Sequence, residues 1–480
     1  MSYVLFDLET TGLDPKWNAP LQAAFLRCDG NLDITEELEL RCRPPAHVVP
    51  SPAAMLVTGL APGDLDGANR SHLAMMEEIA AKLASWSPAT MVAYNGLTFD
   101  EEHLRHALFT TLHPPYLTQR PGNGRADVLV MARAIAALRP EALTVPLVDG
   151  KPSFKLGPLC RANGIDLAEA AAHDALADVR ATLALMKLLR ERTPDLFAML
   201  MANARKDVPA ALLREEETLV LHNGFGGPAP VTGIMASPTN PSAWLVADLT
   251  IDPQTYLGLP ETELAALFTA KGQRPFRNVK TNAQPALFRF ANAGHALEPG
   301  VPAEAEMLRR ITQIRSDETF LTRLRTVLAG RFADREPSPW PEARLYDGFI
   351  SRPDEGHMRR WHEIGWDQRY RFANELFSDE RLKAFANRLM LEHAPQHMPD
   401  DARRQGEAWL RERLTTADEV PWLTLPKALA EVAELRSRET GSPGHLSQLD
   451  AIEAWLVRGQ DAVSRLTAGD ADLGPRPAAA

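Results

Sequence analysis

The sequence predicts an α/β domain, then a β-rich domain, then an all-α domain. Three observations predict this order. Short apolar strands alternate with amphipathic helices in the first part, strand-like segments with Gly, Pro and Asn turns fill the second, and charged helical periodicity fills the third. The expected boundaries are 1–192 for the α/β domain, 193–345 for the β-rich domain, 346–470 for the helical domain and 471–480 for a disordered tail.

The α/β domain is expected to open with strands and then to alternate strands with helices. Apolar, β-branched and aromatic runs predict strands at 3–8, 21–28, 36–42 and 91–94. Apolar residues at three- and four-residue spacing predict helices at 72–86, 100–112, 127–138 and 174–192. The first of these helices ends at Ser87-Pro88, because proline cannot continue a helix.

The β-rich domain contains "TLVLHNGFGG", "AWLVADLTID" and "PALFRFANA", which favour a small barrel or sandwich with inserted helices. Residues 265–331 hold eleven Lys or Arg against five Asp or Glu, the reverse of the balance in the whole chain. "ADREPSPWPE" (333–342) predicts a linker to the helical domain.

The composition is that of a folded protein. The 480 residues are 45% apolar, and no apolar run reaches the roughly 18 residues of a membrane helix. The N-terminus lacks the basic and apolar regions of a signal peptide. Three scattered cysteines, Cys28, Cys42 and Cys160, fit unpaired thiols in a reducing cytoplasm and show no zinc pattern. A net charge of -11 means that any nucleic-acid contact must come from a local basic surface.

Two carboxylates end the first predicted strand. In "FDLETTG" (6–12), Asp7 and Glu9 lie at i and i+2, so both side chains leave the same face. Unpaired, each acid would raise the pKa of the other, and a bound divalent cation removes that penalty. Oxygen ligands select Mg²⁺ or Mn²⁺ over zinc. For this motif alone, the alternative is a solvated pair after a strand.

Two further motifs place acids at the starts of helices. "AYNGLTFD" (93–100) runs from a short strand through Asn95 to Asp100, and "AHDALAD" (172–178) contains His173 and Asp178. Taken alone, Asp100 is an ordinary helix N-cap and His173 an ordinary structural histidine.

In this order and with these gaps, the motifs DxE, YNxxxFD and HxxxxD resemble the DEDD superfamily of 3′→5′ exonucleases, histidine subclass. The resemblance implies a ribonuclease H-like fold, a mixed sheet flanked by helices. It also implies that His173 is the general base. The implied metal-binding and catalytic acids are Asp7, Glu9, Asp100 and Asp178.

The implied chemistry is two-metal-ion hydrolysis of a phosphodiester. Two Mg²⁺ ions about 3.5–4 Å apart would straddle the scissile phosphate, and Mn²⁺ is an expected substitute. One ion orients and acidifies a water, and the other stabilises the charge on the leaving 3′-oxygen. His173 would accept the proton of the water. The products would be 5′-mononucleotides.

Longer segments narrow the resemblance. "GKPSFKLGPLCRANGI" (150–165), "AHDALADVRATLALMKLL" (172–189) and "RLYDGFIS" (344–351) resemble the bacterial exodeoxyribonuclease I family. This resemblance implies a Src-homology-3-like barrel as the β-rich domain and a C-shaped channel formed by the three domains. It further implies processive degradation of single-stranded DNA in repair and recombination, a cytoplasmic monomer, and a partner, the acidic C-terminal tail of the single-strand-binding protein.

Several residues are candidates for substrate binding. Lys155 lies in a matched motif where the family has a basic residue near the substrate phosphate. Arg105, Arg133 and Arg139 are candidate phosphate contacts, each with a surface-ion-pair alternative. The full expected set is Glu9, Thr10, Asn95, Phe99, Arg105, Arg133, Arg139 and Lys155.

A basic lining and stacking aromatics are expected farther along the chain. The candidate cations are Lys271, Arg274, Arg277 and Lys280, with a solvated face as the alternative. The candidate stacking residues are Trp340, Trp361 and Trp366, with buried packing as the alternative. One residue departs from the family pattern: Gly96 follows Asn95 where a second Asn or similar polar residue is expected.

Three alternatives remain open. The acids do not separate DNA from RNA, so a 3′→5′ exoribonuclease is the first. A catalytically silent nucleic-acid-binding module is the second, and the complete set of acids weighs against it. A repair scaffold that acts only by interaction is the third, and it would not require a metal site.

Overall fold

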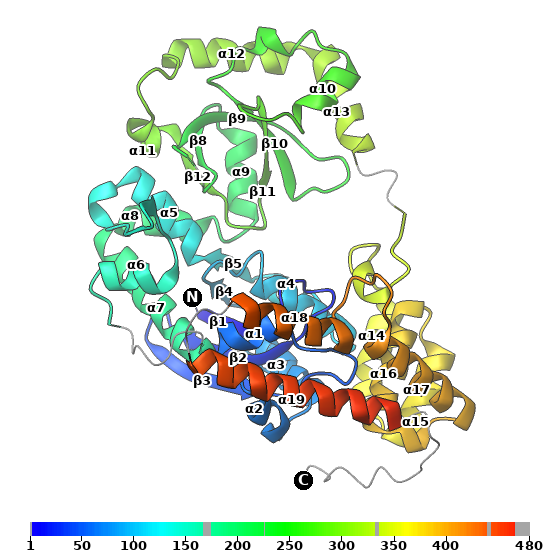
Figure 1. Cartoon of the computed structure of the whole chain (residues 1–480). Coiled ribbons are helices and arrows are strands. Elements are labelled where there is room, and N and C mark those ends of the chain that lie inside the picture. The colour runs from blue at the N-terminus through cyan, green and yellow to red at the C-terminus, as the bar shows by residue number, and fades with distance from the viewer. Residues whose placement is uncertain (1, 167–173, 225, 332–335, 439–442, 466–480) are drawn as a thin grey trace.

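The computed structural model describes residues 2–166, 174–224, 226–331, 336–438 and 443–465. Figure 1 shows a first sheet with its helices in blue to cyan and a β-rich part in green above it. The helical part has its yellow helices to the right of the first part and its orange and red helices across the front of it. The predicted fold class is therefore confirmed: a mixed α/β part, a curled antiparallel sheet and an all-helical region.

The first sheet has the strand order β3-β2-β1-β4-β5. Its strands are β1 (Tyr3–Thr10), β2 (Pro20–Cys28), β3 (Ile34–Arg41), β4 (Thr90–Ala93) and β5 (Gly124–Asp127). β1 pairs antiparallel with β2 and parallel with β4, and β4 pairs parallel with β5. β1 is central, so its side chains alternate between two cores. Leu5 packs in one core, and Val4 and Phe6 pack in the other.

Helices cover both faces of this sheet (Figure 1). They are α1 (Pro52–Thr58), α2 (Pro62–Gly67), α3 (His72–Trp86), α4 (Asp100–Thr110), α5 (Val128–Leu138), α6 (Leu156–Ala162), α7 (Ala175–Arg192) and α8 (Pro194–Ala202). The next helix, α9 (Asp207–Glu215), packs on the β-rich part instead. α7 packs on the face of β1 that carries Leu5, and α3 and α4 pack on the face that carries Val4 and Phe6. A short hairpin, β6 (Leu147–Val148) and β7 (Lys151–Pro152), precedes α6.

The green part is a five-stranded antiparallel sheet with the order β11-β10-β9-β8-β12. Its strands are β8 (Leu219–His222), β9 (Ala229–Ala236), β10 (Ala243–Asp248), β11 (Phe276–Lys280) and β12 (Ala286–Arg289). Its helices are α10 (Glu261–Leu267), α11 (Phe290–Ala293), α12 (Glu304–Ser316) and α13 (Glu318–Gly330). Gly233 on β9 permits close approach of α9, because a Cβ there would lie 2.1 Å from the carbonyl oxygen of Leu213.

The helical part comprises α14 (Arg352–Glu363), α15 (Trp366–Leu376), α16 (Glu380–His393), α17 (Asp400–Thr415), α18 (Leu425–Arg438) and α19 (Pro443–Arg465). It shares two hydrophobic clusters with the first part. Phe109 of α4 packs with Trp361 and Phe385, and Met55 of α1 packs with α18 and α19. These shared cores fix the helical part against the first sheet.

Two expectations about the whole chain can be compared with the structure. Cys28, Cys42 and Cys160 are buried and unpaired, as expected. Among the described residues, no helix is long and apolar enough to cross a membrane. The expected linker at 333–342 lies partly outside the described residues, and the expected disordered tail at 471–480 lies wholly outside them.

Candidate active site

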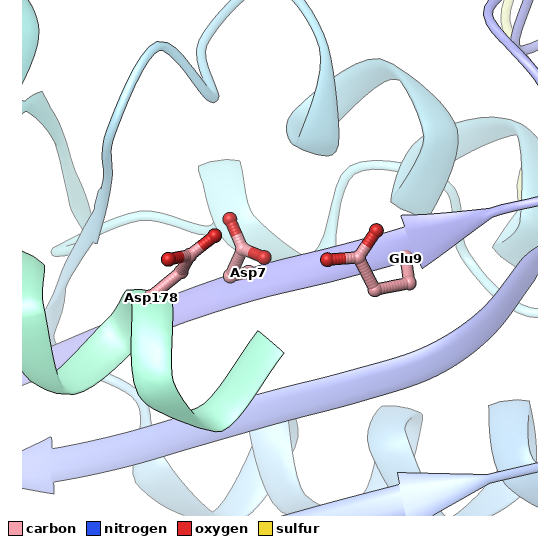
Figure 2. Close-up of side chains that lie close together, drawn as sticks. All are labelled: Asp7, Glu9 and Asp178. Carbon is pink, nitrogen blue, oxygen red and sulfur yellow. The ribbon is translucent and has the colours of Figure 1, made fainter. Parts of the chain in front are cut away.

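Three carboxylates meet on one face of the first sheet. Asp7 and Glu9 leave β1 on the face that α7 covers, and Asp178 lies in the first turn of α7. Figure 2 shows the three side chains turned toward one another. One oxygen from each lies within 4.8 Å of the others. Side chains from the two ends of the first 192 residues therefore form a single cluster, as the DxE and HxxxxD motifs predict.

Asp100 joins the cluster from the other side of β1. It is the first residue of α4 and only 4% exposed, and its Oδ1 accepts a hydrogen bond from the backbone N–H of Leu8 at 3.0 Å. This bond ties α4 to β1 between Asp7 and Glu9. Asp100 lies outside the group of three whose oxygens are within 4.8 Å, so its part in metal binding stays a prediction.

Gly96, the departure from the family pattern, has a structural reason in this chain. A Cβ at this position would lie 2.3 Å from the Cβ of Ala93 and 2.9 Å from Oδ2 of Asp100. The space that a side chain at position 96 needs is thus taken by the Ala93 side chain and the Asp100 carboxylate. Asn95 before it has a φ of 61°, the left-handed conformation that asparagine adopts more readily than most residues.

Burial and mutual repulsion hold protons on these acids. Burial, followed by the charges of Asp178 and Asp100, raises the pKa of Glu9 to about 8. Burial raises the pKa of Asp100 to about 7. Burial and the neighbouring carboxylates, Asp100 first, also raise the pKa of Asp7 well above its usual range. A cluster that strained in its ionised form favours a bound cation.

The donor set fits a hard divalent cation. The group contains only carboxylate oxygens, the ligands that Mg²⁺ and Mn²⁺ prefer. Asp7, Glu9 and Asp178 would hold the ion, and its charge would offset the repulsion among them. The Mg²⁺ prediction is thus supported in its coarser form, an acidic site able to bind metal.

His173, the predicted general base, lies outside the described residues. The next residue, Asp174, is described and caps α7, because its Oδ1 accepts a hydrogen bond from the N–H of Ala177. Asp174 is therefore the N-cap of α7, and the role of His173 stays a prediction.

The expected substrate residues near the acids lie at the end of β1 and in the turn after β4. Thr10 is buried, and its hydroxyl donates to the carbonyl oxygen of Gly12 at 2.8 Å. Asn95 is exposed, and Phe99 is half-buried with its ring 4.3 Å from that of His103. Asp127 supports this loop, because its carboxylate accepts the backbone N–H of Asn95 at 2.8 Å.

Lys155 and Arg133 extend this surface away from the acids. The hydroxyl of Tyr94, next to Asn95, donates to the carbonyl oxygen of Phe154. Lys155 follows Phe154 and is exposed. The guanidinium of Arg133 lies 5.6 Å from the ring centre of Phe154. These contacts connect the loop after β4 to α5.

Arg133 also lines a groove between α5 and the green sheet. Three of the four cations expected in the β-rich domain, Arg274, Arg277 and Lys280, line the same groove. No Asp or Glu is among the described residues that line it. Lys271 is exposed next to the groove residue Gly272.

Two of the expected arginines are engaged in other contacts. Arg105 is 5% exposed and donates to Glu101 at 3.0 Å and Glu102 at 2.6 Å. Arg105 therefore forms ion pairs with these two acids, and the pairs are buried rather than at the surface as the alternative expected. Arg139 lies 2.7 Å from a ring nitrogen of His295 and 3.6 Å from Asp195, which fits its ion-pair alternative.

The aromatic residues open to solvent differ from the expected tryptophans. Trp361 is fully buried, and Trp340 packs edge-on against Trp422, so packing describes both. Trp366 is half-buried against Arg369. Phe349, in contrast, is 89% exposed.

Phe349 belongs to an aromatic cluster beside α4. Its ring centre lies 6.1 Å from that of Tyr116. Tyr346 is half exposed, and its hydroxyl donates to Glu102, two residues after Asp100. Sequence reasoning quoted "RLYDGFIS" only for family likeness. The available signal was four aromatic or apolar residues within six positions, Leu345, Tyr346, Phe349 and Ile350, around Asp347-Gly348.

The family comparisons agree with this geometry. Residues 4–186 match the family model described as Exonuclease, and residues 340–458 match the model of the Exonuclease I C-terminal domain. The first sheet carries a cluster of acids, and the same part of the chain matches the Exonuclease model. Together these findings define the class of the protein: an exonuclease, which is a hydrolase.

Proteins similar over most of this chain identify the family within the exonucleases. The exodeoxyribonuclease I of Haemophilus influenzae is 32% identical over 380 residues, 74% of this chain and 79% of the relative. Exonuclease I from Methylocaldum szegediense has a TM-score of 0.85 at 29% identity, covering 96% of this chain and 99% of that one. E. coli exonuclease I in complex with a dA16 oligonucleotide has a TM-score of 0.82 at 26% identity, covering 95% and 99%. The chain belongs to the exodeoxyribonuclease I family.

Proposed function

We propose that this protein degrades single-stranded DNA from its 3′ end by hydrolysis of phosphodiester bonds, releasing 5′-mononucleotides. The observation that carries the proposal is the cluster of Asp7, Glu9 and Asp178, with Asp100 beside it, in a member of the exodeoxyribonuclease I family. Two Mg²⁺ ions, or Mn²⁺ in their place, are the proposed cofactors.

Each group has a proposed role in the reaction. Bound metal ions would supply an acidified water and charge stabilisation for the leaving 3′-oxygen. Asp7, Glu9, Asp100 and Asp178 hold the ions. His173 accepts the proton of the attacking water. Asn95 and Phe99, in the turn next to the acids, and Lys155, farther from them at the start of α6, hold the 3′ end of the strand.

The groove provides a path for the rest of the strand. A single strand carries one negative charge per nucleotide, so it needs a basic lining without acids. The contacts from Tyr94 through Phe154 to Arg133 connect the active-site loop with the groove cations. We propose that the strand follows this line and that its extended contacts make digestion processive.

Removing groove cations is expected to weaken DNA binding and its salt dependence. Arg274→Ala with Lys280→Ala should make the slope of log affinity against log salt concentration shallower by about 1.4, or about 0.7 per lost phosphate contact. Fluorescence anisotropy with a labelled oligomer in EDTA measures this slope. Arg27→Ala with Lys187→Ala, at the far edge by β3, is the matched control. Equal slopes in both double variants would contradict the groove as the binding path.

Phe349 is expected to stack on a base of the strand. Phe349→Ala should weaken single-strand binding about tenfold, since a base stacked on an aromatic ring contributes about 1–3 kcal/mol. Phe349→Leu keeps an apolar side chain and should weaken binding nearly as much. Val57→Ala removes another exposed apolar group, from α1, and should leave binding unchanged. Full affinity of the leucine variant would show that stacking is not involved.

The substrate class is tested with three 5′-labelled oligomers of one sequence: single-stranded DNA, duplex DNA and single-stranded RNA. Each is incubated with Mg²⁺ or with EDTA. We expect metal-dependent shortening of the single-stranded DNA, slow attack on the duplex and little attack on RNA. Faster RNA digestion would establish the exoribonuclease alternative, and no digestion of any oligomer would favour a silent binding module.

The cellular setting follows from the family. We propose a cytoplasmic monomer that acts in DNA repair and recombination and binds the acidic C-terminal tail of the single-strand-binding protein. Pull-down with a peptide of that tail, with and without its terminal residues, tests the partner.

A further inference from the structure

A buried glutamine on β2, the strand paired with the one that carries Glu9, contacts the start of α7, the helix that carries Asp178. Gln22 on β2 lies opposite Glu9 in the strand register and is 2% exposed. Its Nε2 donates to Oδ2 of Asp174 at 3.0 Å and to Oε1 of Glu39 at 3.0 Å. Both N–H groups of the amide are thus used, and both partners are carboxylates.

Arg41 completes the contact from β3. Its Nη2 donates to the same Oδ2 of Asp174 at 2.9 Å and lies 3.2 Å from Oε1 of Glu39. Gln22 and Arg41 therefore converge on one carboxylate oxygen of Asp174. β2, which pairs with β1, and β3, the edge strand beyond it, are thus both tied to the start of α7.

Asp174 is also bonded to the first turn of α7, which carries Asp178. Its second oxygen, Oδ1, caps the helix at Ala177 with a distance of 3.2 Å. Its backbone carbonyl oxygen accepts the N–H of Asp178 at 3.0 Å. The two carboxylate oxygens of Asp174 thus have different roles. Oδ1 caps the helix, and Oδ2 binds the helix to β2 and β3 of the sheet.

A cap alone does not explain an aspartate here. Serine or asparagine caps a helix as well, and a further negative charge next to the acids is unfavourable. The charge of Asp174 does add to the repulsion that raises the pKa of Asp7 and of Glu9. The hydrogen bonds that the Asp174 carboxylate accepts from Gln22 and Arg41 offset this added repulsion.

We infer that Gln22, Arg41 and Asp174 form a positioning cluster that holds α7 on the sheet and so keeps Asp178 within ligand distance of Asp7 and Glu9 before metal binds. The inference rests on the proposed metal-dependent hydrolysis. Without the cluster, repulsion among the three acids would let the start of α7 move away, and metal binding would have to pull it back.

The test measures Mn²⁺ binding without DNA, from the electron paramagnetic resonance signal of free Mn²⁺. Gln22→Leu is nearly isosteric and changes no charge. We expect it to weaken Mn²⁺ binding about tenfold, as loss of a residue that orients a metal ligand typically does. The Mg²⁺ concentration for half-maximal digestion should rise by the same factor. Digestion at saturating Mg²⁺ and DNA affinity in EDTA should stay near those of the wild type.

Arg41→Gln separates positioning from simple electrostatics. Removing a positive charge near the acids would by itself tighten cation binding. Loss of the anchor predicts the opposite, weaker Mn²⁺ binding. Ser71→Ala is the control for stability, because it removes the N-cap of α3, a helix that carries none of the acids.

The possible outcomes are distinct. Weaker Mn²⁺ binding in both Gln22→Leu and Arg41→Gln, with Ser71→Ala unchanged, supports the positioning cluster. Wild-type Mn²⁺ affinity in Gln22→Leu, with only a lower melting temperature as in Ser71→Ala, would overturn it while leaving the proposed function intact. A wild-type protein that binds no Mn²⁺ would overturn the proposed metal site together with the cluster.

Discussion

Asp178→Asn is expected to lower the rate of single-strand digestion by at least about 10³-fold, a loss typical of removing a group that stabilises charge in the transition state. The asparagine keeps the size of the side chain and the first turn of α7, but it removes one of three carboxylates whose oxygens lie within 4.8 Å. DNA affinity measured in EDTA should stay within about twofold, because phosphate contacts farther along the strand carry most of it.

The same variant should be more stable than the wild type when metal is absent. Removing one charge relieves the repulsion that the charge of Asp178 exerts on Glu9 and Asp7. Thermal unfolding in EDTA should therefore show a higher midpoint for Asp178→Asn. Glu191→Gln, at the exposed far end of the same helix, is the matched control and should change neither activity nor midpoint. Activity above about a tenth of the wild-type rate would contradict a metal-binding role for Asp178.

Metal removal and pH are expected to act on the same acids. EDTA should abolish digestion. The affinity for Mg²⁺ should rise as the pH increases from about 6 to 8.5, since the metal displaces protons held by Glu9, with a pKa of about 8, and Asp100, with a pKa of about 7. The limit is about tenfold per pH unit for each proton displaced. Calorimetric titration in buffers of different ionisation enthalpy measures both the affinity and the number of protons released.

The sign of the stability change follows from the same pKa values. In the metal-free folded state these acids keep their protons up to about pH 7 or 8, whereas in the unfolded chain they lose them near their ordinary carboxyl values. The folded state therefore binds more protons in this window, and its stability in EDTA should fall as the pH rises through it. Mg²⁺ should restore the loss. A Mg²⁺ affinity that does not change with pH would contradict the raised pKa values.

The sheet and the acids could be predicted because their signals are local. Val4, Leu5 and Phe6 are consecutive, so their alternation between the two cores follows from the strand itself. The two-residue spacing of Asp7 and Glu9 likewise places both side chains on one face. The helix 72–86 was predicted with the bounds that the structure has, since its apolar spacing and the Ser87-Pro88 pair after it are local signals.

Features that depend on distant partners could not be predicted in this way. β5, "GRAD", contains no β-branched or aromatic residue and is a strand only because it pairs with β4. Arg105 is buried by contacts that include the hydroxyl of Tyr346, 241 residues later. The 89% exposure of Phe349 likewise depends on where the chain before α14 lies, which no local pattern records.

Asp127 and Gln284 are further examples of such long-range dependence. The amide of Asp127 donates to the Gln284 side chain at 2.6 Å, which places the β-rich part against the loop that carries Asn95. Sequence reasoning identified neither residue, because a buried glutamine in a turn has no pattern of its own.

Digestion from the 3′ end by the acid cluster is tested most directly with one DNA strand that carries different dyes at its 5′ and 3′ ends. The strand is digested with Mg²⁺ by the wild type and by Asp178→Asn. We expect the wild type to release the 3′ dye first, on a mononucleotide, while the 5′-labelled strand shortens step by step, and we expect the variant to do neither. Early release of the 5′ dye, internal cuts, or equal digestion by the variant would contradict it.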